Sequence, residues 1–253
     1  MSSSNIISII MAGGLGKRMK SETPKVLLSV QNRPMIIHVL EKALEISEHY
    51  VIVVVGRYET EIRNCIETYM NTSQKHKIHY IKQQEGVTNG EPHSMGTGDA
   101  LKCCMPFLEE IGQNAKVVVL SGDVPMITTE LLEKFSSYEN ALIVSESRDP
   151  TGYGRVFINA DGTFTVREHK FCQEHMLFYK YVNVGLYIFS IAFLSKHMNT
   201  LQVNSSGEIF LTDLPFQHFM YWRDFSLFTN VNTMDELTQL NHTAVSITDC
   251  IFM

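Results

Sequence analysis

Residues 6–19 read IISIIMAGGLGKRM, in which a compact apolar run leads straight into a glycine-rich loop. Apolar residues occupy every position of 6–11 except Ser8, as is typical of a strand buried in a sheet. Glycine at Gly13, Gly14 and Gly16 lets the backbone turn sharply and lets successive N–H groups approach a ligand closely. The stretch therefore predicts a buried strand that ends in a tight turn open to an anionic ligand.

Outward from this stretch, helical and strand patterns alternate along the first half of the chain. The predicted strands are residues 6–11, 51–55, 78–81 and 117–120, and the predicted helices are residues 35–46, 61–69 and 99–108. Residues 51–55 are five apolar residues in a row, which is typical of a parallel strand covered on both faces. Because parallel strands need helical crossovers, the alternation predicts an α/β fold with a Rossmann-like, mixed and mostly parallel sheet flanked by helices.

The second half of the chain has a different character. Residues 154–158 and 163–167 predict a hairpin around Asp161 and Gly162, and residues 184–189 predict another strand. Helical patterns follow at residues 208–220 and 234–240. Because no repeat or linker interrupts the chain, we expect one domain over residues 1–253. Its two lobes would span about residues 1–140 and 141–230, with a C-terminal helix at about residues 231–245.

Composition excludes several classes of partner. The 253 residues are 44% hydrophobic and 19% charged, the balance of a folded globular protein. Lys plus Arg is 21 and Asp plus Glu is 27, so the net charge of −6 predicts no nucleic-acid partner. The chain has five cysteines without a C-x-x-C pair, no signal peptide, and no apolar run near the roughly 18 residues of a membrane helix. We therefore expect a cytoplasmic protein without a membrane partner.

Two familiar phosphate-binding patterns fail at the glycine loop. A dinucleotide fingerprint needs a third glycine at position 19, which is Met19. A Walker loop needs Ser or Thr after its Gly-Lys pair, but Arg18 follows Lys17. Arg18 and the downstream Lys25 still offer phosphate a bidentate fork and a point charge. The alternative is an ordinary tight turn with exposed basic residues.

The loop and Pro24-Lys25 resemble the opening motif of the sugar-nucleotide pyrophosphorylases, which are nucleotidylyltransferases. Further segments match this family in order, namely residues 83–85 (QQE), 96–100 (GTGDA), 120–125 (LSGDVP), 149–155 (DPTGYGR), 168–170 (EHK), 183–185 (NVG), 207–213 (GEIFLTD) and 231–232 (VN). Over about residues 5–241 the chain is similar to the uridylyltransferase domain of the bacterial bifunctional enzymes that make UDP-N-acetylglucosamine.

This resemblance implies a nucleotide-binding lobe followed by a sugar-binding lobe. The implied reaction is UTP + N-acetylglucosamine 1-phosphate ⇌ UDP-N-acetylglucosamine + pyrophosphate, with Mg²⁺ as cofactor. Two alternatives stay open: another sugar 1-phosphate, such as glucose 1-phosphate with UTP or dTTP, and a catalytically silent nucleotide-sugar-binding regulator. The bifunctional enzymes continue into a β-helix acetyltransferase that this sequence lacks. We therefore expect acetylation to occur elsewhere, and any homo-oligomer not to be a β-helix trimer.

The resemblance also implies which residues bind the nucleotide. Arg18 and Lys25 would be the catalytic cations at the α-phosphate and the leaving pyrophosphate. The nucleotide-binding residues would be Ala12, Gly13, Gly14 and Gly16 in the loop, with Gln83, Gly96 and Thr97 at the uracil. Residues 86–94 are an insertion relative to the family, so Gln84 stays open as the alternative to Gln83.

A metal site and a sugar pocket are implied in the same way. Asp123 and Asn232 would supply oxygen ligands to Mg²⁺, which keeps waters and binds triphosphate oxygens; a turn or N-cap aspartate is the alternative for Asp123. The sugar-binding residues would be Gly154, Glu168, Asn183 and Thr212, with Glu208 beside them. Lys17, Ser121 and Phe210 depart from the family's usual residues, and Tyr153 and Arg155 are expected to be structural.

Overall fold

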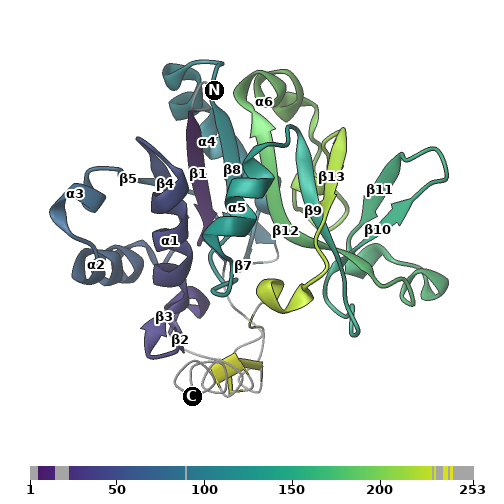
Figure 1. The fold of residues 1–253 in the computed structure, drawn as a ribbon, viewed down its shortest axis with the longest axis horizontal. Helices are drawn as coiled ribbons and strands as arrows, with labels where there is room; N and C mark the ends of the chain where they lie inside the picture. The colour runs from purple at the N-terminus through teal and green to yellow at the C-terminus, as the bar shows by residue number, and fades with distance from the viewer. Residues whose placement is uncertain are drawn as a thin grey trace.

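The computed structural model describes residues 5–14, 23–88, 90–229, 231, 236–238 and 240–241. Within these residues, one mixed sheet of nine strands forms the centre of the molecule, and helices cover both of its faces (Figure 1). The main path of the sheet runs β11-β10-β12-β8-β1-β4-β5, while β9 pairs with β12 and β13 pairs with β9. The predicted α/β class with a mixed sheet is confirmed.

Four neighbouring strands are parallel and come from the amino-terminal half of the chain. They are β1 (Ile6–Met11), β4 (Val51–Val55), β5 (Ile78–Lys82) and β8 (Lys116–Ser121). Strand β1 lies between β8 and β4, with Ile10 opposite both Leu120 and Val53. The four strands predicted in this half are confirmed, and their carboxyl ends lie at one edge of the sheet.

Helices cover the two faces of the sheet, and this cover explains why the strands have continuous apolar sequences. They are α1 (Met35–Ile46), α2 (Glu59–Tyr69), α3 (Thr72–Lys75), α4 (Thr97–Ile111), α5 (Thr129–Ser136) and α6 (Ile191–His197). All five residues of β4 are buried: Val51, Val53 and Val55 belong to the core that includes α1, whereas Ile52 and Val54 belong to the core that includes α4. A strand covered on both faces needs apolar residues at every position. The three predicted helices are confirmed, two of them starting two residues earlier than expected.

The second half adds antiparallel pairings to the same sheet. Its strands are β9 (Ala141–Glu146), β10 (Gly154–Ile158), β11 (Phe164–Arg167), β12 (Tyr181–Ser190) and β13 (His218–Tyr221). Strand β12 is antiparallel to β8, β9 and β10, so the sheet continues through both expected lobes. The predicted hairpin is confirmed as β10 and β11, with Gly162 at a φ of 83° in its turn.

The helix predicted at residues 208–220 is wrong. This segment contains the 3-10 turn η6 (Leu211–Asp213) and strand β13, which pairs in parallel with β9. Pro215 lacks the amide hydrogen that a continuing helix needs. The backbone of Ile209 is already engaged, since its N–H donates to Met95 O and its carbonyl accepts from Gly98 N, both at 2.8 Å. The helix-like spacing of apolar residues reflects burial against the sheet instead.

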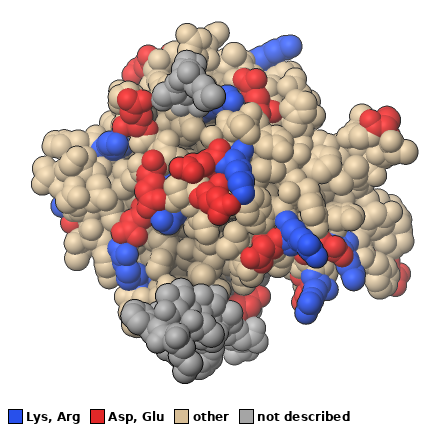
Figure 2. Space-filling view, in the orientation of Figure 1, with Lys and Arg blue, Asp and Glu red and all other residues tan. Residues whose placement is uncertain are grey.

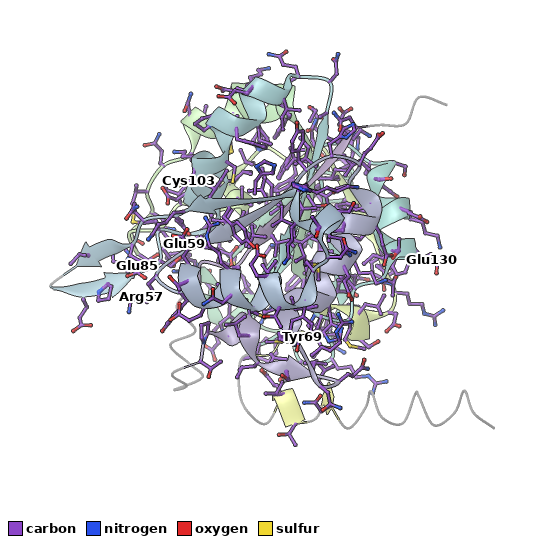
Figure 3. The ribbon with its side chains drawn as sticks, turned by 90° about the vertical axis from the view of Figure 1, so that its left-hand side faces the viewer. Arg57, Glu59, Tyr69, Glu85, Cys103 and Glu130 are labelled. Atoms are coloured by element: carbon purple, nitrogen blue, oxygen red, sulfur yellow. The ribbon has the colours of Figure 1, made fainter. Side chains whose placement is uncertain are left out.

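Short elements complete the fold. They are the paired strands β2 (Ser29–Val30) and β3 (Arg33–Pro34), the paired strands β6 (Gly86–Thr88) and β7 (Glu91–His93), and the 3-10 turns η2 (Lys25–Leu27), η3 (His169–Phe171), η4 (Glu174–Met176), η5 (Met198–Thr200) and η7 (Phe225–Phe228). The expected insertion is the hairpin β6–β7, and Arg57 pairs with Glu85 at its base, with Nε 2.6 Å from Oε1 (Figure 3). Of the expected C-terminal helix, residues 236–238 and 240–241 are helical, and the rest except 231 lies outside the described residues.

Acidic and basic side chains are intermixed on the face shown in Figure 2. Ion pairs of the protein include Arg33 of β3 with Glu41 of α1 at 2.6 Å, and Lys134 with Glu130 one turn away in α5 at 2.6 Å. Among the described residues, no helix combines the length and apolarity needed to cross a membrane.

Candidate active site

A cavity of about 610 Å³ lies at the carboxyl ends of the central parallel strands. Open α/β sheets bind their ligands at this edge, and β10 and β12 supply the opposite wall. Eleven of the residues predicted for the site line the cavity: Gly13, Gly14, Lys25, Gln83, Gly96, Thr97, Asp123, Gly154, Glu168, Asn183 and Glu208. The fold thus brings together motifs that are spread over almost 200 positions of sequence.

The other predicted site residues do not line the cavity or are not described. Ala12 is buried, and its N–H donates to Val54 O at 2.9 Å. Thr212 makes its contact through Glu168, to which its hydroxyl donates a 2.8 Å hydrogen bond. Gly16, Arg18 and Asn232 lie outside the described residues, so their roles stay predictions.

The start of the glycine loop is held close to the end of β4. A side chain at Gly56 would place its Cβ 2.8 Å from the carbonyl oxygen of Gly13. A Cβ at Gly13 would lie 3.3 Å from Oε1 of Gln83. Two backbones can approach this closely only without side chains, so Gly13 and Gly14 present bare backbone to the cavity.

Lys25 and Asp123 form an ion pair between Nζ and Oδ2 inside the cavity. Both side chains are largely buried, with exposed fractions of 15% and 13%. The Ser121 hydroxyl donates to the other carboxylate oxygen of Asp123 at 2.5 Å. Gly122 N donates to Met11 O at 3.0 Å, which joins the end of β8 to the end of β1. The Asp123 carboxylate is therefore held in place on both of its oxygens.

Gln83 lies at the cavity wall directly after β5 and is only 8% exposed. Its Nε2 donates to Gly96 O and to Asp99 Oδ2, each at 2.9 Å. Both neighbours are acceptors, so the amide nitrogen must face them. The Gln83 side chain can therefore meet a ligand only as an acceptor, through Oε1. Gln84 is exposed and does not line the cavity.

The turn at Gly96 and Thr97 is hydrogen-bonded to η6 and packs closely against Ile209 just before it. Gly96 has a φ of 92°, and a Cβ there would lie 2.3 Å from Ile209 O. Thr97 Oγ1 accepts a 3.2 Å hydrogen bond from Leu211 N. Glycine at position 96 is required both by the left-handed backbone and by this contact. The turn therefore links the two expected lobes at the cavity.

Glu168 lines the cavity beside β10 and β12, and Thr212 supports it from behind through their hydrogen bond. Burial raises the pKa of the Glu168 carboxyl above its usual value, and the hydrogen bond from Thr212 offsets part of this effect. Gly154 packs beside them, since a Cβ there would lie 3.6 Å from both Glu168 carboxylate oxygens. Glu168 thus offers a ligand a largely desolvated carboxylate acceptor in this part of the cavity.

Asn183 and Tyr187 are joined across an irregular part of β12. Gly185 N donates to Asn183 Oδ1 at 3.1 Å, which leaves Asn183 Nδ2 to donate to the Tyr187 hydroxyl at 2.8 Å. The pairing of β12 with β9 shifts its register between these two residues, and Gly185 has a φ of 80°. Such a bulge redirects side chains at a site, and here both residues line the cavity.

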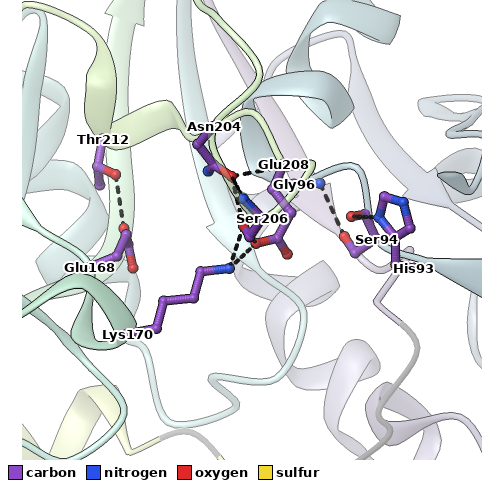
Figure 4. A network of polar contacts seen from close by, with 9 residues as sticks. All are labelled: His93, Ser94, Gly96, Glu168, Lys170, Asn204, Ser206, Glu208 and Thr212. Atoms are coloured by element: carbon purple, nitrogen blue, oxygen red, sulfur yellow. Dashed lines mark hydrogen bonds and ion pairs between the residues drawn. The ribbon is translucent and has the colours of Figure 1, made fainter. Parts of the chain in front are cut away.

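Glu208 belongs to a polar network on the rim of the cavity (Figure 4). It forms an ion pair with Lys170, whose Nζ is also 2.9 Å from Ser206 Oγ. Asn204 Oδ1 accepts from Ser206 N at 2.8 Å and from Glu208 N at 3.2 Å, which holds the loop in shape. The Glu208 carboxylate is thus engaged by a cation from the segment that follows β11.

Several lining residues were not predicted as site residues. His93 and Ser94 come from the inserted hairpin; Ser94 Oγ accepts from Gly96 N at 3.1 Å, and a His93 ring nitrogen lies 2.9 Å from Ser94 O. Tyr153 and Tyr187 also line the cavity, although Tyr153 was expected to be structural. Arg155, by contrast, is buried as expected. An inserted hairpin carries no family motif, so only the fold reveals its contribution.

Asp123 supplies carboxylate oxygens to the cavity, the donor type that Mg²⁺ prefers. Among the described residues, no group of three or more His, Cys, Asp or Glu side chains could hold a metal ion. Mg²⁺ at nucleotide sites is usually bound by one or two carboxylates together with substrate phosphates. Asp123, a carboxylate in the cavity that already holds one cation, fits this requirement.

Comparisons with known proteins identify a family and a fold for this chain. The family model described as nucleotidyl transferase matches residues 7–221. The chain is 32% identical over 213 residues to the probable UDP-N-acetylglucosamine pyrophosphorylase of Acanthamoeba polyphaga mimivirus, covering 81% of this chain and 78% of that protein. It is 34% identical over 215 residues to the bifunctional protein GlmU of Clostridium botulinum (strain 657 / Type Ba4), covering 82% of this chain and 43% of that protein.

The chain therefore spans less than half the length of this bacterial relative. Among solved structures, a putative glucose-1-phosphate thymidylyltransferase from Bacillus anthracis, in complex with a sucrose, has a similar fold with a TM-score of 0.66. The match covers 94% of this chain and 95% of that one at 19% identity, so the likeness concerns the fold alone.

Proposed function

The chain belongs to the nucleotidyl transferase family, and on this premise we propose that it transfers the uridylyl group of UTP to N-acetylglucosamine 1-phosphate and releases pyrophosphate. The name of the viral relative, a probable UDP-N-acetylglucosamine pyrophosphorylase, supports this choice of substrates. The observation that carries the proposal is a single cavity that joins Lys25 and Asp123 to Glu168 and Asn183. The charged pair of Lys25 and Asp123 suits a triphosphate with its metal ion, whereas the polar side chains of Glu168 and Asn183 suit a sugar.

The nucleotide end suits an anionic triphosphate. Gly13 and Gly14 offer bare backbone, and Lys25 offers a cation beside them in the cavity. Gln83 would meet the base as an acceptor through Oε1, since both of its amide hydrogens are engaged, and the N3–H of uracil is a matching donor. Gly96 and Thr97 would pack against the same ring.

In the proposed reaction, a phosphate oxygen of the sugar 1-phosphate attacks the α-phosphorus of UTP. The bond from that phosphorus to the bridging oxygen of pyrophosphate breaks, and pyrophosphate leaves with the electron pair. Because the attacking oxygen is already anionic, no general base is needed, and catalysis consists of positioning and charge stabilisation. We assign the charge stabilisation to Lys25, with Arg18 as the second cation.

We propose Asp123 as the carboxylate that holds Mg²⁺, with Asn232 as a second oxygen ligand. When bound, Mg²⁺ would neutralise negative charge on the triphosphate. The present ion pair supports the assignment, because Asp123 already holds the Lys25 ammonium, and Ser121 orients its second oxygen. Glu168, Asn183, Gly154 and Thr212 would surround the sugar, and Glu208 would support the rim through Lys170.

The proposal is tested by pyrophosphate release from the purified chain with UTP and N-acetylglucosamine 1-phosphate, and with glucose 1-phosphate and dTTP as the competing substrates. We expect UDP-N-acetylglucosamine to form at the highest kcat/KM. A higher value for glucose 1-phosphate would overturn the sugar assignment. Binding of UDP-N-acetylglucosamine without any turnover would instead identify a regulator that lacks catalysis.

A further inference from the structure

Tyr187 occupies an unusual place in the wall of the cavity. It is 5% exposed and lies just after the bulge of β12. Its ring stacks on Phe189 and Phe216, with centroid distances of 6.2 and 5.8 Å. The ring is therefore held rigidly by the core behind it, while the residue still lines the cavity in front.

The Tyr187 hydroxyl can both accept and donate a hydrogen bond, and among the described residues only its acceptor role is filled. It accepts a hydrogen bond from Asn183 Nδ2 at 2.8 Å. Burial, with a smaller contribution from the charge of Glu168, raises the pKa of this phenol well above its usual value, so the hydroxyl keeps its proton. Among the residues that the structure describes, no recorded hydrogen bond accepts that proton. A buried donor normally has an acceptor, so one is expected from a ligand.

The surroundings of this hydroxyl indicate which ligand group would meet it. Glu168 offers an acceptor in the same wall, and Tyr187 offers a donor. Val184 and Phe210 add apolar surface to the cavity. An acylamino group presents an N–H donor, a carbonyl acceptor and an apolar methyl, which together complement these three features. A hydroxyl substituent leaves the apolar surface uncovered.

We propose that Tyr187 is a further specificity-determining residue, whose hydroxyl donates to the acyl carbonyl of a 2-acylamino sugar phosphate. Asn183 is the positioning residue, because its Nδ2 donates to the phenol oxygen and so leaves the O–H of Tyr187 to act as a donor. This inference rests on the proposed function and adds to it the contact that separates an acylamino sugar from glucose.

The test is the Tyr187→Phe variant, which removes the hydroxyl and keeps the stacked ring. We expect KM for N-acetylglucosamine 1-phosphate to rise about 5- to 10-fold, the effect of one lost neutral hydrogen bond. KM for UTP, kcat, and KM for glucose 1-phosphate should stay within twofold. The matched control is Tyr80→Phe, which removes a partly buried phenol on β5 that lies under Arg63, outside the cavity.

An equal change for both sugar phosphates, or no change for either, would overturn the proposal. Calorimetric binding of UDP-N-acetylglucosamine and UDP-glucose supplies a readout that does not depend on turnover. We expect the wild-type preference for the acylamino product to be lost in Tyr187→Phe and kept in Tyr80→Phe. A wild-type chain that shows this preference without turnover would defeat the proposed function but support Tyr187. If the wild-type chain shows turnover but Tyr187→Phe keeps the preference, the proposed function is supported and the role of Tyr187 is refuted.

Discussion

Lys25 and Asp123 are bonded in the cavity although 98 positions separate them in the sequence. Lys25 belongs to the turn η2 after the glycine loop, whereas Asp123 follows the end of β8. Their pairing places the cation of one motif on the carboxylate of another, at the edge of the sheet where ligands bind. The proposed roles of both residues depend on this arrangement, and the first two predictions examine it.

Replacing Lys25 with alanine should lower turnover by roughly 10²–10³-fold, the usual effect of losing one preorganised charge contact at a transition state. Pyrophosphate release at saturating UTP measures it. Lys42→Ala is the matched control, because it removes a lysine paired with Glu45 on the surface of α1. Turnover of Lys25→Ala within threefold of wild type would refute its assigned role.

Replacing Asp123 with asparagine should raise the Mg²⁺ concentration needed for half-maximal activity. Replacing a residue that only hydrogen-bonds to a metal ligand typically lowers metal affinity about 10–100-fold. We expect at least this change for a direct ligand. A Mg²⁺ titration of pyrophosphate release measures it, with the surface variant Glu130→Gln as control. An unchanged titration curve would exclude Asp123 as a ligand.

Glu168 should make stability depend on pH. Burial raises its pKa above the usual 4.5, so the folded form binds this proton more tightly than the unfolded chain does. Its stabilising contribution is fully present below the unfolded pKa and is lost as the pH rises through the folded pKa. Glu168→Gln removes the ionisation, and it should therefore be more stable than wild type at pH 8 but not at pH 4.

Thermal unfolding from pH 4 to pH 8 measures this difference. In a chain of this size, a change of about 1 kcal/mol in unfolding free energy shifts Tm by about 2–4 °C, so the measurement can detect the higher Tm that we expect for Glu168→Gln at pH 8. The control is Glu146→Gln, an exposed position at the end of β9. A Tm difference that is the same at every pH would contradict the expected titration of Glu168.

Gly96→Ala should be far more costly than Gly112→Ala, although both glycines have a positive φ of 92° and 100°. This positive-φ extended backbone, which is almost exclusive to glycine, by itself costs an alanine about 1–3 kcal/mol. A Cβ at Gly112 meets no atom within 4 Å, whereas one at Gly96 would lie 2.3 Å from Ile209 O. Overpacking adds about 1–3 kcal/mol. Urea unfolding of both variants measures the difference, and equal losses would show that the contact is unimportant.

Much of the fold follows from local patterns. The continuous apolar residues of β4 reveal a strand buried on both faces, and the apolar spacing of α1 reveals its helix, because these signals lie within a few neighbouring residues. The same reasoning predicted a helix at residues 208–220 wrongly, because the residues buried against the sheet there happen to follow a helical spacing. Pairing of β13 with β9 joins segments almost 80 positions apart, which no local pattern records.

For the candidate site, the primary structure specified which chemical groups are available and their order, since motifs such as residues 11–14 and 120–125 can be recognised without coordinates. It did not specify their partners. Three pairings became known only from the folded chain: Lys25 with Asp123, the amide nitrogen of Gln83 with Gly96 and Asp99, and Asn183 with the Tyr187 hydroxyl. The reason is physical: a hydrogen bond or ion pair depends on distances of about 3 Å, and between remote segments those distances are set by how the whole sheet and its helices pack.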